Sequence, residues 1–132
     1  MNILKGHINS IKVNGDLSIV KVKVGEVVFS TILIDTPETA PYLKLDNEVS
    51  VIFKETEVIL GVGDMGGISL RNKIKGKVSH IDSDTLLSKV IIETDIGKVT
   101  SIITSNAVKQ LQIVLGLELT AMIKTNELML SK

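Results

Sequence analysis

The chain repeats itself: a shift of 70 residues, without a gap, places its first half on its second. Lys5-Gly6 falls on Lys75-Gly76, and Lys54, Glu57 and Leu60 fall on Lys124, Glu127 and Leu130. A duplication with a constant offset makes each half a structural unit. Units of about 62 residues bury a small share of their surface and are marginal alone. We therefore expect the halves to pack on each other or on further chains.

Composition excludes several classes of function. The chain has 15 basic and 15 acidic residues, and only three aromatic residues, Phe29, Tyr42 and Phe53. Nucleic-acid binding is not expected, because it needs a basic track and aromatic platforms. The absence of cysteine excludes disulfides and thiolate chemistry. The apolar runs are too short for a membrane span, and no cleavable signal opens the chain, so we expect a cytoplasmic protein with an aliphatic core.

Short runs of alternating apolar and polar residues predict strands in both halves. We expect strands over 3–13, 17–24, 27–34, 48–54 and 57–60, and again over 74–81, 86–94, 99–104, 118–124 and 127–130. The last two strands are expected to close each half. One short helix per half is expected after the third strand, beginning at Thr36-Pro37-Glu38 and covering Asn106–Leu111.

This order of elements is typical of a small barrel of the oligonucleotide/oligosaccharide-binding (OB) type. The predicted fold class is therefore all-β, with one short helix per repeat and two tandem five-stranded OB-like β-barrels. The glycine-rich segment 62–68 predicts a flexible linker. We expect a first repeat over 1–61 and a second over 69–132.

Catalysis has little support in the sequence. The only histidines, His7 and His80, occupy non-equivalent positions of the two halves. Neither lies in a catalytic or metal-binding motif. We expect both to be partly exposed strand residues, and we do not expect an enzyme.

Three groups of residues could bind an anion. Arg71, the only arginine, offers a rigid fork of donors suited to oxyanions. Lys124-Thr125 ends a strand, and Thr104-Ser105-Asn106-Ala107 begins a helix, where free N–H groups attract anions. Each group also has a simpler interpretation. Arg71 could form an ordinary surface ion pair, Lys124 could be a strand-end lysine repeated from Lys54, and Thr104–Ala107 could merely cap the helix.

Together these groups match a known pattern. The second half reads Ser69-Leu70-Arg71-Asn72 at its start, Thr100-Ser101-Ile102-Ile103-Thr104 before its helix and Ile123-Lys124-Thr125 near its end. It resembles the molybdate-binding Mop or TOBE domain, which typically reads Ser-Ala-Arg-Asn, Ile-Thr-x-x-Ser and Ile-Lys-Ala/Ser at these places. The resemblance covers residues 69–131 and, more faintly, 2–60, so the whole chain resembles a tandem di-Mop molbindin.

The resemblance implies an oxyanion site between neighbouring domains and subunits of a homotrimer. Its ligand would be molybdate or tungstate, with no organic cofactor and no directly liganded metal ion. The candidate oxyanion-binding residues are Ser69, Arg71, Asn72, Thr104, Ser105, Asn106, Ala107, Lys124, Thr125 and Lys54. Because a tetrahedral dianion presents acceptors only, a pocket of donors suits it and penalises a protonated phosphate.

The first half departs from the family pattern. Met1 aligns with Arg71, Ile34 with Thr104 and Pro37 with Ala107, and Lys54 is followed by Glu55, which would repel a dianion. In the second half, Ala107 stands where the family has a serine, so only backbone could bind there. We therefore expect the ligand chemistry to concentrate on the second repeat, with the first acting mainly as scaffold.

The expected function is storage and homeostasis of molybdate or tungstate by a binding protein. The alternative is a ligand-sensing regulatory module of a molybdate transporter or repressor system, acting with a separate partner. The chain contains no nucleotide-binding loop and no helix-turn-helix segment. A stand-alone binding role is therefore favoured.

Overall fold

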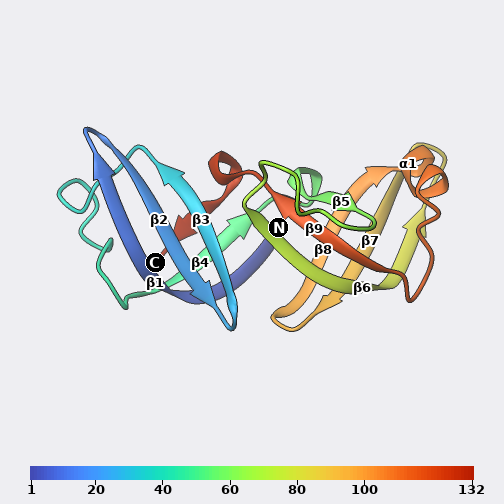
Figure 1. Cartoon of the computed structure of the whole chain (residues 1–132), viewed down its shortest axis with the longest axis horizontal. Coiled ribbons are helices and arrows are strands. Elements are labelled where there is room, and N and C mark those ends of the chain that lie inside the picture. The colour runs from blue at the N-terminus through green and yellow to red at the C-terminus, as the bar shows by residue number, and fades with distance from the viewer.

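The computed structural model describes all residues, 1–132, and shows two β-rich halves side by side (Figure 1). The strands are β1 Asn2–Asn14, β2 Leu17–Val24, β3 Val27–Leu33, β4 Glu48–Phe53, β5 Ile59–Gly61, β6 Asn72–Ser83, β7 Leu87–Thr94, β8 Gly97–Thr104, β9 Glu118–Ile123 and β10 Met129–Ser131. The helices are α1 Ser105–Gln110 and two 3₁₀ turns, η1 Glu55–Glu57 and η2 Thr125–Glu127. None of the helices is long and apolar enough to cross a bilayer. The all-β prediction is confirmed.

The two halves exchange their last strands. The first sheet has the order β10-β4-β1-β2-β3, and the second has the order β5-β9-β6-β7-β8. Strand β10, from the end of the chain, therefore lies beside β4 in the first half, and β5 lies beside β9 in the second (Figure 1). The prediction that each half closes with its own last two strands is wrong.

The exchange follows from the short segments that join β4 to β5 and β9 to β10. A tight hairpin needs residues with positive φ in its turn, as at Gly15 (φ 64°) and Gly25 (φ 58°). No residue between β4 and β5 has positive φ. Instead Lys54 and Val58 are extended on either side of η1, so the chain is carried forward into the other half rather than folded back.

Four hydrogen-bonded contacts related by the repeat lock the halves together. The side-chain amide of Asn72 accepts from the N–H of Ser30 (2.7 Å) and donates to its carbonyl (2.9 Å). The amide of Asn2 pairs in the same way with Thr100, at 2.8 and 2.9 Å. The hydroxyl of Thr31 donates to the carbonyl of Leu128 (2.8 Å), and Ser101 does the same to Val58 (2.9 Å). The residues before β10 and β5 are thereby tied to β3 and β8.

One continuous apolar core runs through both halves. It is mainly Val, Ile and Leu, as the composition predicted, and the rings of Phe29 and Phe53 lie 6.4 Å apart within it. Each half also has one point of very close backbone approach. A Cβ at Gly6 would lie 2.4 Å from the carbonyl oxygen of Lys23, and one at Gly76 would lie 2.4 Å from that of Glu93. This contact explains why glycine is repeated at positions 6 and 76.

Only the second half contains the predicted helix. It covers Ser105–Gln110, one residue earlier at each end than predicted. The helix predicted at Thr36-Pro37-Glu38 is wrong, because the carbonyl of Thr36 accepts from Thr39 and Ala40 and the turn then ends. Pro41 explains the difference, since proline disfavours helical backbone at the preceding residue and has no N–H to extend the helix.

We expect Asn72→Ala to lower the free energy of unfolding by about 2–3 kcal/mol, because the N–H and carbonyl of half-buried Ser30 would lose their partners. Urea unfolding measures the change, and Asn126→Ala, at an exposed position, is the control. A loss below about 0.5 kcal/mol would match an ordinary surface substitution and contradict the structural role of Asn72.

Candidate functional site

The strongest group of donors lies at the end of the second half that faces the first. Arg71 directly precedes β6 and Lys124 directly follows β9, and the pairing of Asn72 with Ile123 makes these two residues neighbours across the strands. Both side chains are exposed. Asn72 contacts β3 through Ser30, so this cationic pair lies where the two halves meet.

Arg71 is held by its own linker. Its Nε donates to the carbonyl of Ser69 (3.2 Å), and its Nη2 donates to the carbonyl of Ile68. Since a guanidinium has five N–H donors, three remain for a ligand. Arg71 forms no salt bridge, so the simpler interpretation of an ordinary surface ion pair does not describe it.

Asn72 has a structural role. Its side chain is fully buried, and both of its polar atoms pair with the backbone of Ser30. The amide is therefore inaccessible to an oxyanion, whereas the motif predicted that Asn72 is an oxyanion-binding residue. Ser69, Lys124 and Thr125 remain at least partly exposed beside Arg71.

In the equivalent turn of the first half, a glutamate side chain caps the backbone. The N–H of Lys54 donates to Oε1 of Glu57 (3.1 Å), and Glu55 lies next to it. No side chain caps the corresponding turn after Lys124. The two turns therefore differ in Glu55, which stands where the second half has Thr125, and in the bond of Glu57, since its equivalent Glu127 forms no such cap.

The third group, Thr104–Ala107, lies at the outer end of the second half, at the start of α1 (Figure 1). The hydroxyl of Thr104 accepts from the N–H of Ala107 (3.1 Å), which is the helix cap of the simpler interpretation. Ser105 is buried, and its hydroxyl bonds with that of Ser88 (2.8 Å) and donates to the carbonyl of Asp84 (2.8 Å). Thr104 and Asn106 are exposed.

The two groups do not meet within one chain. Arg71 precedes the first residue of β6, whereas the carbonyl that holds Ser105 belongs to Asp84, just past its last residue. The 12 residues of β6 correspond to roughly 40 Å of strand contour. A site that uses both groups therefore requires a second chain.

Asp84, in the connection between β6 and β7, anchors the outer group. Its Oδ1 accepts from the N–H groups of Leu87 (2.8 Å) and Leu86 (2.9 Å). These two bonds lower the pKa of the exposed carboxyl. The N–H of Ser105 donates to the carbonyl of Leu86 (2.9 Å), so Asp84 orients the loop against which α1 begins.

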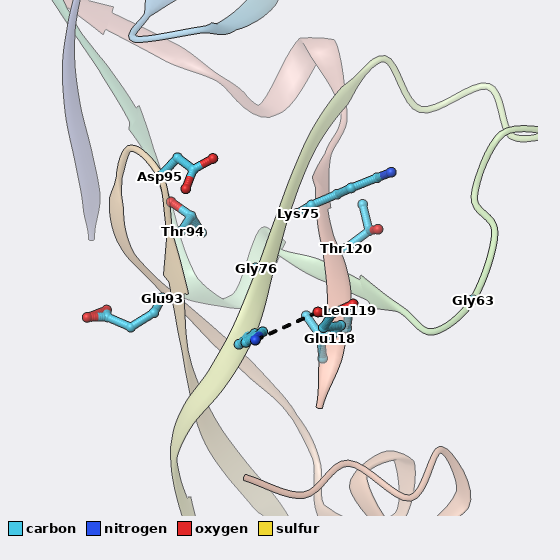
Figure 2. Close-up of a pocket in the computed structure, with 10 residues that line it drawn as sticks. Gly63, Lys75, Gly76, Glu93, Thr94, Asp95, Glu118, Leu119 and Thr120 are labelled. Carbon is cyan, nitrogen blue, oxygen red and sulfur yellow. Dashed lines mark ion pairs between the residues drawn. The ribbon is translucent and has the colours of Figure 1, made fainter. Parts of the chain in front are cut away.

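A pocket on the second half contains none of the candidate residues. Its volume is about 580 Å³, and it lies on the second half where β6 passes β7 and β9 (Figure 2). Glu93, Asp95 and Glu118 line it together with Lys75 and Lys77, and Lys77 pairs with Glu118 at 3.8 Å. Because carboxylates outnumber lysines, this pocket is unsuited to a dianion.

The fold does not bring together a metal-binding cluster. No three His, Asp or Glu side chains are placed to hold a metal ion. His7 and His80 are exposed residues of β1 and β6, as predicted.

Comparison with known proteins identifies the family. The TOBE domain matches residues 68–130. Molybdenum-pterin-binding protein 1 of Clostridium pasteurianum is 41% identical over 64 residues, which are 48% of this chain and 94% of that protein. The chain belongs to the Mop/TOBE family. A further member, molybdenum-pterin-binding protein MopB of Rhodobacter capsulatus, is 31% identical over 116 residues, 85% of this chain and 43% of MopB.

The Mop/TOBE assignment extends to the whole chain through a solved structure. The cytoplasmic molybdate-binding protein ModG, in a crystal form with molybdate bound, aligns with a TM-score of 0.86 and 27% identity. The alignment covers 98% of this chain and 94% of ModG. Both halves of the chain and their relative placement are therefore shared with ModG.

We expect acid to weaken the anchor at Asp84. A carboxyl whose pKa is lower in the folded state stabilises the fold above its unfolded pKa of about 3.9, and this contribution is lost as pH falls through the folded value. Urea unfolding below about pH 4 should therefore show a steeper loss of stability for the wild type than for Asp84→Asn, with Asp82→Asn as the matched control. Equal slopes for wild type and Asp84→Asn would contradict the anchor.

Proposed function

We propose that this protein binds molybdate or tungstate in the cytoplasm and serves in storage and homeostasis of the oxyanion. The observation that carries the proposal is the pair Arg71 and Lys124, kept side by side at the ends of β6 and β9 in a Mop/TOBE chain. The related protein ModG is a cytoplasmic molybdate-binding protein. This assignment makes the chain a binding protein rather than an enzyme.

The chemistry of the exposed donors suits the ligand. The free N–H groups of Arg71, the Lys124 ammonium and the hydroxyls of Thr125 and Ser69 can all donate to an acceptor-only dianion. Two cations offset the cost of removing the ligand's double charge from water. Glu55, which stands beside Lys54 where the second half has Thr125, would repel a dianion in the first half, so we place the ligand chemistry in the second half.

We further propose that the working form is a homotrimer in which the loop Thr104–Ala107 of one chain completes the site of another. The opposite placement of the two groups in one chain supports this assembly. Uncovered apolar side chains on the outer face of the first half support it as well: Ile3, Ile52 and Met129 are adjacent across β1, β4 and β10, and Ile3 is 59% exposed.

We expect Arg71→Ala to weaken molybdate binding by about 1.5–3 kcal/mol, the usual worth of a hydrogen bond to a charged group. Isothermal titration with molybdate, tungstate, sulfate and phosphate measures the affinity. Lys89→Ala removes an exposed charge from the middle of β7 and is the control. If the wild type gives no heat with molybdate or tungstate, the proposed function is wrong.

We expect light scattering to give three times the chain mass for the wild type. Ile3→Glu should shift the protein toward smaller species, because it places a charge in the uncovered apolar row. Lys5→Glu, at the next outward-facing position of β1, tests whether charge alone explains the shift. A wild type that is monomeric at every concentration would overturn the trimer.

A further inference from the structure

The linker between β5 and β6 is fastened to the second half. The ammonium of Lys73, in β6, donates to the carbonyl of Met65 (2.7 Å). Within the linker itself, the N–H of Gly66 donates to Oδ1 of Asp64 (2.9 Å). Met65 also packs closely on the sheet, because a Cβ added at Gly61 would collide with both Met65 Sδ and Met122 Cε. Although Met122 lies outside the main core, it is only 1% exposed. The linker therefore covers the outer face of β9.

The fastened linker ends at the arginine. The carbonyls of Ile68 and Ser69 hold two of the N–H groups of the Arg71 guanidinium. These carbonyls can orient Arg71 only if the linker that carries them is itself held in place. The bond from Lys73 to Met65 is the side-chain contact that ties the linker to β6, two residues from Arg71.

The first half lacks this arrangement. Ile3 stands in the place of Lys73 and has no donor, and Ile52 stands in the place of Met122 and is only half-buried. Met1 stands in the place of Arg71. The bond between Lys73 and Met65 and the arginine thus occur in the same half of the chain.

We propose that Lys73 is a positioning residue for oxyanion binding: by holding Met65 it fixes the linker, whose carbonyls at Ile68 and Ser69 preorganise the guanidinium of Arg71. This inference rests on the proposed function, because it names the cause of affinity at the same site. Holding a long side chain in its bound orientation before binding reduces the entropy that binding would otherwise lose.

The test compares two lysines on one strand. Lys73→Met keeps the apolar stem and removes the donor, whereas Lys75→Met removes the same charge from an exposed residue that makes no bond to the linker. Titration with molybdate should show binding weakened about threefold to tenfold in Lys73→Met, the worth of ordering one long side chain. Lys75→Met should stay within about twofold of the wild type. Lys73→Arg, which keeps a donor, should restore most of the affinity.

A double-mutant cycle separates positioning from a general loss of structure. If Lys73 acts through Arg71, adding Lys73→Met to Arg71→Ala should change molybdate affinity no further. Additive losses in the cycle, or equal affinities for Lys73→Met and Lys75→Met, would overturn the proposal.

Hydrogen exchange separates this proposal from the proposed function. Lys73→Met should speed exchange at the amides of Gly66–Leu70, and Lys75→Met should not. If wild-type protein binds no molybdate, the proposed function fails, and the positioning role fails with it whatever the linker amides do. If the wild type binds molybdate but the linker amides exchange alike in both variants, only the proposed positioning role of Lys73 is wrong.

Discussion

Two buried asparagine amides determine how the halves of this protein fit together. Each presents one acceptor and one donor to the backbone of a single residue in the other half, Asn72 to Ser30 and Asn2 to Thr100. No apolar side chain could satisfy both groups, and a shift of the halves by one residue would leave them unpaired. Because Arg71 directly precedes Asn72, the same pairing places the proposed anion-binding arginine one residue from the contact with β3. The Asn72 amide thus contributes both to the packing of the halves and to the placement of the site.

Features that depend on neighbouring residues were predicted correctly from the sequence. Features that depend on a pairing partner far away in the chain were not. Alternation of apolar and polar residues identified every strand to within a few residues, because burial on one face of a sheet imposes that pattern. It carried no information on which sheet receives β5 or β10, since a three-residue strand fits either edge equally well. The missing first-half helix has a local cause that was present in the sequence: Pro41 follows only four residues after Pro37 and stops the turn.

The candidate site shows the same division. The motif residues Arg71 and Lys124 were identified from the sequence, and their adjacency follows from the strand register. The motif could not reveal that the Asn72 side chain pairs with the backbone of Ser30, or that Lys73 holds the linker. Nor could it reveal that the hydroxyls of Ser83, Ser88 and Ser105 form a hydrogen-bonded chain. Those roles depend on which backbone groups the fold leaves unpaired nearby, and polar side chains of the same type do different work in different surroundings.

The exchanged strands also bear on how such a duplicated gene can evolve. Once each copy supplies the closing strand of the other, neither can be deleted without leaving an open sheet edge in its sister. A copy that loses its ligand-binding residues is consequently still required for the integrity of the copy that keeps them. The first repeat, with Met1 and Glu55 at the motif positions, fits this history: selection can relax on its chemistry while its backbone remains indispensable.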